Sequence, residues 1–347
     1  MRKFSKNALI AVGVVALAAG CGNNSSGAAS SSGGGGTEIT FQLNNPPNGS
    51  NAGFAAAVEE GYYKAAGINA TIVPGTGSSL TVQMVASGKA KIGYADSTST
   101  TQLIAQKAPL VVLATVYQSN PNEVIALKKS GITSIAALKG KKVGTPVPSS
   151  QASMLPLFLA SNGLTKNDVQ LINLAPTSLV QSLLQGRVDA ILGSIDTYQV
   201  QLEQQNAGEL FTAPFATNGV PTVSTSIFAN KDWAAQNKTA VQAFVKASLQ
   251  GWKLASTNPD KAVADVNQLW GAKADKGSAA ELKAVLDAKL LCAGNAEYVG
   301  RAEPDQWTKT QDLLSQVGLL PKGIDPATYY SYDYLPASSD LQTCPIG

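Results

Sequence analysis

The stretch PGTGSSLTVQMVASGKAKIGYADSTS, from Pro74 to Ser99, contains a unit that the chain repeats further along as PTSLVQSLLQGRVDAILGSIDTYQ, from Pro176 to Gln199. In both copies Val-Gln precedes a Gly and a basic residue, and a short apolar run then leads to Gly-x-x-Asp followed by Ser or Thr. Each copy is typical of a helix that returns the chain to a buried strand. In open α/β sheets, ligands bind outside the carboxyl ends of the strands, so the two copies predict opposite walls of one cleft.

Strand-like and helix-like segments alternate outward from these copies, which indicates an α/β fold with largely parallel sheets. A chain of 347 residues is long enough for two domains. The expected strands are 37–43, 68–75, 91–97, 109–118, 122–131, 141–147, 169–175, 188–195, 211–215 and 223–230. Helices are expected over 53–66, 78–88, 150–162 and 179–185, and the carboxyl end is expected to be largely helical.

Composition excludes several function classes. The formal net charge is +3 and the Lys and Arg residues are scattered, so no nucleic-acid partner is expected. The chain has no His and three Cys, which removes the usual general base of a catalytic triad and the commonest ligands of zinc, iron and copper. We therefore expect no enzyme activity, no metal and no cofactor.

The amino terminus resembles an export signal. Residues 1–20 begin with basic residues and continue through an apolar stretch that is too short to span a membrane. The ending Ala19-Gly20-Cys21 resembles a bacterial lipobox, which predicts a lipidated Cys21, although Ala18 fills the place where the lipobox usually has Leu. Residues 21–36 are Gly- and Ser-rich and predict a flexible tether beside the membrane. An ordinary secreted protein with an unpaired Cys is the alternative.

Export favours an oxidising compartment, in which Cys292 and Cys344 are expected to form a disulfide. Two buried free thiols are the alternative.

Hydroxyl side chains stand at two expected helix starts, where free N–H groups can hold an anionic group of a ligand. They are Ser78 and Ser79 after Gly77, and Ser149 with Ser150. Plain capping of the helix explains the same residues equally well.

Two carboxylates occupy matching places in the repeated unit. Asp96 with Ser97 and Asp196 with Thr197 follow the apolar runs. If both carboxylates face the cleft, they favour a ligand with N–H donors or a positive charge and disfavour a bare oxyanion. Helix capping is the competing explanation.

Amide and aromatic side chains complete the candidate ligand site. Asn44, Asn45 and Asn48 follow the first strand and can both donate and accept hydrogen bonds, although a Pro-rich turn uses Asn as readily. Tyr117 and Tyr198 are candidates for contact with a flat ligand, and each also suits simple packing.

Three segments give the chain a family resemblance: EEGYYKAAGINATIVPGTGSSLTVQMVASGKAKIGYADSTS, LKGKKVGTP and LVQSLLQGRVDAILG. They resemble the substrate-binding proteins of ABC importers, in the group that handles nitrate, taurine, alkanesulfonates and the pyrimidine precursors of thiamine. The resemblance implies a periplasmic-binding-protein type 2 clamp. Its first lobe is 37–125 plus 228–335, its second is 126–227, two crossover strands join them, and 336–347 form a tail.

The resemblance also implies a monomer that is lipid-anchored outside the cytoplasm, closes around a small molecule and delivers it to a permease. The segment LNNPPNGSNAGF departs from the pattern of the pyrimidine-precursor binders, because Asn44 stands in place of a Trp and no His is available. An enzyme of thiamine-pyrimidine synthesis shares this fold, but its His and Cys-rich segment are missing here. A nitrogen heterocycle, an amine or an alkanesulfonate remains open as the ligand, and a sensory or scavenging protein with the same clamp is the alternative function.

Overall fold

The computed structural model describes residues 36–271 and 275–345. The predicted export signal, the lipidated Cys21 and the tether up to Gly35 lie outside the described residues. Two five-stranded sheets organise the rest. The first contains β1 (Thr37–Gln42), β2 (Ile68–Val73), β3 (Ile92–Asp96), β4 (Leu110–Thr115) and β10 (Thr225–Asn230). The second contains β5 (Asn122–Leu127), β6 (Lys142–Thr145), β7 (Gln170–Asn173), β8 (Ala190–Ser194) and β9 (Leu210–Pro214).

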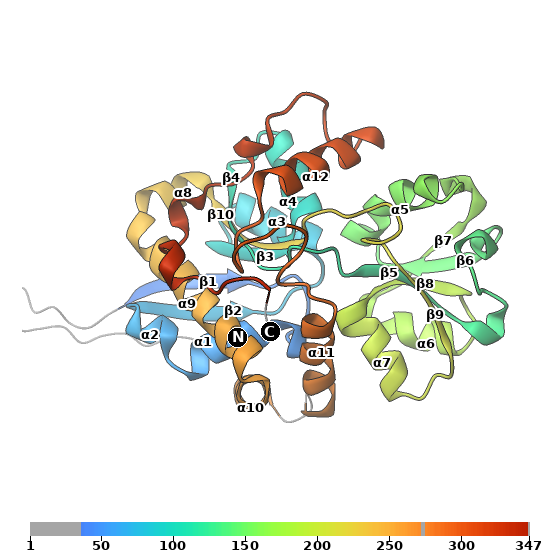
Figure 1. Ribbon diagram of the computed structural model, residues 1–347, viewed down its shortest axis with the longest axis horizontal. Coiled ribbons are helices and arrows are strands. Elements are labelled where there is room, and N and C mark those ends of the chain that lie inside the picture. Colours follow the sequence, from blue (N-terminus) through green and yellow to red (C-terminus); the bar gives the residue numbers. More distant parts are fainter. Residues whose placement is uncertain (1–35, 272–274, 346–347) are drawn as a thin grey trace, which may run out of the picture. The chain divides into compact units, whose positions relative to one another are not determined.

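Helices flank both sheets (Figure 1). They are α1 (Ala52–Glu59), α2 (Tyr62–Ala65), α3 (Ser78–Ala86), α4 (Ser97–Ala105), α5 (Ser150–Ser161), α6 (Leu179–Leu184), α7 (Val200–Gln204), α8 (Lys231–Gln236), α9 (Lys238–Thr257), α10 (Pro259–Trp270), α11 (Asp275–Asp287) and α12 (Pro304–Gln316). Two short elements matter for the site: the 3-10 turn η1 (Gly49–Asn51) and the π-helical turn η6 (Ile195–Gln199).

Both sheets are mixed, but four of the five strands in each run in the same direction, which agrees with the expectation of mainly parallel sheets. The strand orders are β2-β1-β3-β10-β4 and β7-β6-β8-β5-β9. The pairs β1–β2 and β1–β3 are parallel, as are β6–β7 and β6–β8. In each sheet, the strand that arrives from the other sheet runs antiparallel to both of its neighbours, β10 in the first and β5 in the second. Two connections, 116–121 and 215–224, therefore join the sheets.

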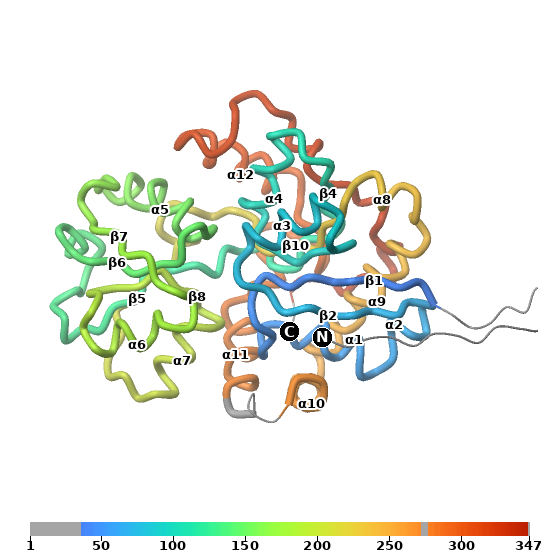
Figure 2. The backbone as a smooth tube through the Cα atoms, turned by 180° about the vertical axis from the view of Figure 1, so that it is seen from behind, coloured from blue at the N-terminus to red at the C-terminus, as the bar shows by residue number. Residues whose placement is uncertain are grey.

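The core of the first sheet explains one close helix contact. Phe41 on β1 meets Phe54 on α1 edge-on, with ring centroids 4.9 Å apart, and Phe54 meets Trp252 on α9 at 5.6 Å. A Cβ atom on Gly53 would lie 2.3 Å from the Trp252 ring, so only glycine lets α1 and α9 approach this closely. Figure 2 shows α1, α9 and α10 on one side of β1 and β2, with α3 and α4 on the other.

Two details differ from the expected helices. The helix expected over 53–66 is divided into α1 and α2, because Gly61 takes a left-handed conformation with φ +70°. The segment after Asp96 forms the helix α4, as the capping interpretation of Asp96 implies, although it was not among the expected helices, and most of its small hydroxyl side chains are buried.

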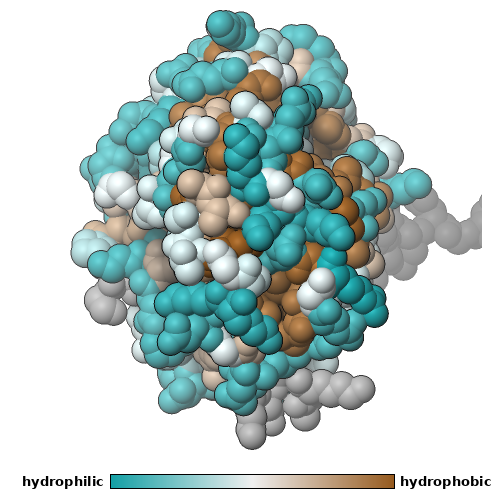
Figure 3. All heavy atoms as spheres, turned by 90° about the vertical axis from the view of Figure 1, so that its right-hand side faces the viewer, coloured by the Kyte–Doolittle hydropathy of each residue, from teal (hydrophilic) through white to brown (hydrophobic). Residues whose placement is uncertain are grey.

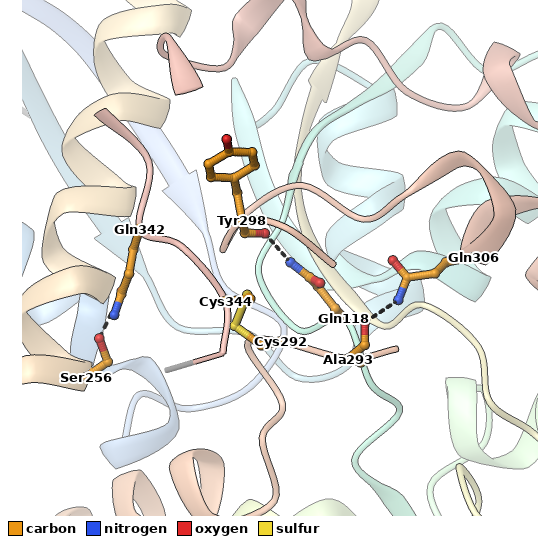
Figure 4. Close-up of a disulfide and its surroundings, with 8 residues drawn as sticks. All are labelled: Gln118, Ser256, Cys292, Ala293, Tyr298, Gln306, Gln342 and Cys344. Atoms are coloured by element: carbon orange, nitrogen blue, oxygen red, sulfur yellow. Dashed lines mark hydrogen bonds between the residues drawn. A yellow bond between two sulfur atoms is a disulfide. The ribbon is translucent and has the colours of Figure 1, made fainter. Parts of the chain in front are cut away.

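Surface and covalent features complete the fold. None of the described helices is long and apolar enough to cross a membrane. Hydrophilic atoms cover much of the face over the second sheet, with hydrophobic atoms exposed between them (Figure 3). Cys292 and Cys344 are joined by a disulfide that lies beside Gln118 in the first connection (Figure 4). Gln118 donates hydrogen bonds to the carbonyl oxygens of Tyr298 and Leu290, at 2.7 Å in each case.

Candidate ligand-binding site

A cavity of about 320 Å³ lies between the two sheets and takes its walls from both. Most of the residues that the sequence singled out as candidates line it: Asn44, Asn45, Asn48, Gly77, Ser78, Asp96, Tyr117, Ser149, Ser150, Asp196, Thr197 and Tyr198. The repeated unit thus brings its two strand ends to one cavity, in the arrangement that the sequence predicted.

Ser79 and Ser97 do not line the cavity. The Ser97 side chain is fully buried and donates to the carbonyl oxygen of Ser224, and its hydroxyl also lies 2.8 Å from that of Ser226. It therefore holds α4 against β10. Ser79 is the second residue of α3, where its half-buried side chain turns away from the cavity.

The Asn-rich loop after β1 is fixed by its backbone. The carbonyl of Asn44 accepts a hydrogen bond from the Gly77 N–H at 2.6 Å, and that of Asn45 accepts from Gly75 at 3.1 Å. A Cβ atom on Gly75 would lie 2.0 Å from the carbonyl oxygen of Leu43, so glycine is required for the two loops to pack. The Asn44 and Asn45 side chains are left free to face the cavity.

Asp96 performs the capping role that the sequence left open. Its Oδ1 accepts from the Thr98 N–H at 2.8 Å, and its Oδ2 accepts from the Ser224 hydroxyl at 3.0 Å. Its own N–H donates to Ser78 Oγ at 3.1 Å, which ties the start of α3 to the end of β3. Burial raises the pKa of the Asp96 carboxyl, and the bonds from Thr98 and Ser224 oppose that rise.

Asp196 occupies a different local position from Asp96. β3 ends at Asp96 itself, whereas β8 ends at Ser194 and Asp196 lies inside the turn η6. Its Oδ2 accepts a hydrogen bond from the Tyr117 hydroxyl at 3.3 Å. Burial raises the pKa of this carboxyl as well, although hydrogen bonds from Ser194, Ser50 and Tyr117 act in the opposite direction. Asp196 does not cap a helix, and it lines the cavity.

Glu281 is the carboxylate that sequence reasoning missed. It lies on α11, lines the cavity and is 5% exposed. Its Oε1 accepts from Asn48 Nδ2 at 3.1 Å, and its Oε2 accepts from the Gly49 N–H at 2.9 Å. Burial raises its pKa to about 7, the charge of Asp196 adds to the rise, and the two hydrogen bonds oppose it.

The turn η1 lies between these two carboxylates. Asn48 accepts from the Ser50 N–H at 3.0 Å and so caps the turn whose first N–H is held by Glu281. On the other side, the Ser50 hydroxyl donates to the backbone carbonyl of Asp196 at 3.1 Å. η1 therefore connects α11 to the second sheet's side of the cavity.

Two hydroxyl-bearing helix starts face the cavity, as predicted. Ser149 accepts from the Ala152 N–H at 3.1 Å and caps α5. Ser78 begins α3, and no side chain caps that helix. Three Tyr rings also line the cavity, from Tyr94, Tyr117 and Tyr198, and Tyr94 was not predicted. Burial raises the pKa of all three phenols, so they remain neutral at physiological pH.

Other lining residues escaped the sequence reasoning because they are common residue types without a motif. They include Ser50, Asn122, Ser194, Gln201, Ser224 and Thr225. Ser224 ends the second connection and Thr225 follows it, and Asn122 follows the first connection. Their position in the sequence could have identified some of them, because residues at the end of a connection between the two sheets must lie near the cleft.

Comparison with known proteins identifies relatives of the chain. Residues 48–262 match the family model described as NMT1/THI5 like. A Haemophilus influenzae protein named for thiamine biosynthesis is 31% identical over 229 residues, which cover 65% of this chain and 71% of the relative. The riboflavin-binding protein RibY of Chloroflexus aurantiacus is 25% identical over 316 residues, which cover 87% of each chain.

A solved structure supports the fold. The alkanesulfonate-binding protein SsuA of Xanthomonas axonopodis pv. citri, bound to MOPS, superposes with a TM-score of 0.66. The match covers 85% of this chain and 98% of that chain at 17% sequence identity. At this identity the likeness concerns the architecture, which is that of periplasmic binding proteins.

Proposed function

The chain belongs to the NMT1/THI5-like family, and on that premise we propose that it is an extracytoplasmic substrate-binding protein that captures a small polar organic nutrient for an ABC importer. The observation that carries the proposal is the cavity of about 320 Å³ whose walls come from both sheets and meet through the hydrogen bond from Ser50 to Asp196. Cavities of this size enclose small organic molecules.

Hinge closure is the proposed means of capture. The predicted lobes, 37–125 plus 228–335 and 126–227, would rotate about the two connections, 116–121 and 215–224. Contacts between opposite walls then form only in the closed arrangement, and the pair Ser50 and Asp196 is such a contact. A ligand that touches both walls would favour the closed state by its differential affinity.

A nitrogen heterocycle related to the pyrimidines is the proposed ligand class. Buried carboxylates accept hydrogen bonds from ring or exocyclic N–H groups, and Asp196 and Glu281 are placed to do so. The names of two relatives point the same way, toward thiamine biosynthesis and riboflavin binding. An alkanesulfonate fits less well, because its anionic group would lie beside carboxylates with no Lys or Arg among the lining residues.

Anchoring and delivery complete the proposal. Lipidation at Cys21 and the tether 22–36 would hold the clamp beside the membrane, where a permease can accept the ligand. The alternative is a sensory or scavenging protein that presents the ligand to a signalling partner. Loss of uptake of the ligand on deletion of a permease encoded nearby would favour import. Unchanged uptake would favour sensing.

Thermal unfolding with a panel of pyrimidines, flavins, amines, sulfonates and inorganic anions tests the proposal. A ligand at a hundred times its dissociation constant adds about 2.7 kcal/mol, which raises the melting temperature by roughly 5 °C. We expect a selective shift with one class of nitrogen heterocycle, weakened by Asp196→Asn. A shift with sulfonates alone would contradict the ligand class, and recovery of a chemically changed ligand would indicate an enzyme instead.

A further inference from the structure

The charges around the cavity do not balance. Three carboxylates line it, from Asp96, Asp196 and Glu281, and no Lys or Arg stands among the lining residues. Each of the three side chains is at most 5% exposed. Burying a carboxylate without a compensating cation is costly, so an uncompensated group of three requires an explanation.

The lysines that form ion pairs in the described part of the chain have partners away from the cavity. The ion pairs join acidic partners to Lys128, Lys139, Lys246, Lys261 and Lys283. The side chain of each of these lysines is at least 42% exposed. None of those pairs includes Asp96, Asp196 or Glu281. Among the described residues, therefore, none that lines the cavity supplies a positive charge to it.

Asp196 and Glu281 are the pair best placed to share one external charge. Both residues contact the turn η1: the Glu281 carboxylate accepts from the Gly49 N–H, and the backbone carbonyl of Asp196 accepts from the Ser50 hydroxyl. Asp196 is the carboxylate whose charge acts on Glu281, whereas Asp96 caps α4 through the Thr98 N–H. Each oxygen of Asp196 and Glu281 keeps accepting capacity beyond the bonds already made.

Aromatic rings give a second, independent indication. Tyr94, Tyr117 and Tyr198 line the same cavity, and the face of a neutral phenol attracts an organic cation. The Tyr117 hydroxyl lies 2.9 Å from the Ser50 carbonyl oxygen and 3.3 Å from Asp196 Oδ2, and its single hydrogen is shared between these two acceptors, so its ring is held beside the carboxylate. Asn122 also lines the cavity, and its buried side-chain Nδ2 is a hydrogen-bond donor without an acceptor among the described residues.

We propose that the ligand is an organic cation, an ammonium or a protonated nitrogen heterocycle, whose charge is held between Asp196 and Glu281. The inference rests on the proposed function and narrows its ligand class. The cation supplies the charge that the cavity lacks, and the Tyr rings enclose its apolar part. An acceptor on the ligand would meet the amide of Asn122.

Binding should also release protons. A cation beside Glu281 favours the ionised form of that carboxyl and lowers its pKa from about 7. Asp196 is the charged group that acts on Glu281, and Asn48 and Gly49 are its hydrogen-bond donors. Calorimetry near pH 7 in two buffers of different ionisation enthalpy would therefore give different apparent binding enthalpies for a cationic ligand.

A matched pair of ligands tests the charge directly. The full chain is titrated with 4-amino-5-aminomethyl-2-methylpyrimidine, whose aminomethyl group is protonated at pH 7, and with its neutral 5-hydroxymethyl analogue. A second pair without a heterocycle, benzylamine and benzyl alcohol, repeats the comparison. We expect the cation of at least one pair to bind about tenfold or more tightly than its partner, as for hydrogen bonds to charged groups.

Variants of the two carboxylates test which residues bind the charged group of the ligand. Glu281→Gln keeps the shape of the side chain and should reduce the preference for the cation at least fivefold, as should Asp196→Asn. Glu203→Gln is the matched control, since Glu203 is exposed on α7 and does not line the cavity. Unfolding curves of each variant verify that it is folded.

The outcomes separate the two proposals. Equal binding of the amine and the alcohol would overturn the inference and leave the proposed function intact. Binding of neither compound in either pair would contradict both. A preference for the cation that Glu281→Gln and Asp196→Asn leave unchanged would overturn the assignment to these two residues, and tight binding of Ca²⁺ or Zn²⁺ alone would replace the organic cation with a metal ion.

Discussion

The hydroxyl of Ser50 donates a hydrogen bond of 3.1 Å to the backbone carbonyl of Asp196 and so joins a turn beside the first sheet to a turn of the second. The same Ser50 accepts a hydrogen bond from Tyr117 through its own carbonyl, at 2.9 Å. One small residue thus contacts a cavity wall on each sheet and the connection between them. It is therefore the place where the closed arrangement is most directly testable.

Ser50→Ala should weaken ligand binding and leave the unfolding of the unliganded protein nearly unchanged. The closed state loses one hydrogen bond of about 1 kcal/mol, so the dissociation constant should rise about fivefold. Calorimetric titration with the ligand found in the panel measures it. Ser79→Ala is the control, because Ser79 does not line the cavity. Equal losses in both variants would mean that the contact has no special role.

Glu123 predicts a pH dependence of stability. This residue of β5 is fully buried and neither carboxylate oxygen has a hydrogen-bond partner. Burial, with the charges of Asp196 and Glu203, raises its pKa to about 8 from an ordinary 4.5. The folded state therefore binds the proton more tightly than the unfolded chain. The corresponding stability is present below about pH 4.5 and is lost as the pH rises toward 8.

Glu123→Gln removes that titration. Its free energy of unfolding should exceed that of the wild type at pH 8, by roughly 2–5 kcal/mol at most, and the two should converge toward pH 5. Urea unfolding at several pH values measures the difference. Glu209→Gln is the matched control, since Glu209 is exposed and follows α7 in the same part of the chain. Parallel curves for the wild type and Glu123→Gln would show that Glu123 does not titrate in this range.

The close contact at Gly53 leads us to predict that a larger residue there lowers the stability of the protein. Alanine at this position would place its Cβ 2.3 Å from the Trp252 ring, so α1 and α9 would have to separate. We expect Gly53→Ala to lower the free energy of unfolding by about 1–3 kcal/mol or more, as overpacked cores do. Gly277→Ala is the matched control on α11, where the nearest atom is 3.8 Å away and alanine should stabilise the helix by about 0.5–1 kcal/mol. Similar melting temperatures for the two variants would contradict the close contact.

The sequence predicted part of the site correctly where a repeated sequence pattern could be combined with the rule that ligands bind beyond the ends of strands. Asp96 and Asp196 were placed at the cavity because both follow buried strands, and ligands bind beyond strand ends. The pattern did not show that the two differ. Asp96 ends β3 and caps α4, whereas Asp196 lies two residues beyond β8 inside η6. The place where the strand ends relative to the Asp therefore separates a residue that caps a helix from one that lies inside a turn.

Glu281 could not be predicted in the same way. It stands in SAAELKAVLD, where a charged residue of a mixed helix is normally expected on the solvated face. Its place in the cavity depends on how α11 packs against η1 and α7, which is a long-range relationship (Figure 1). The break at Gly61 was missed for the opposite reason, because helical periodicity continues across a residue whose left-handed conformation ends α1.

The disulfide between Cys292 and Cys344 gives the last prediction. It ties the end of the chain to the segment after α11, and that segment accepts hydrogen bonds from Gln118 in the first connection (Figure 4). In the full chain, denatured without reductant, we expect at most one free thiol, that of an unlipidated Cys21, and two more after reduction. The bond closes a loop over a separation of 52 residues, and the chain-entropy model gives it about 4 kcal/mol. Cys292→Ser with Cys344→Ser should therefore lower the free energy of unfolding by up to that amount, whereas Cys21→Ser should leave it unchanged. Three thiols before reduction would show that the pair is not formed.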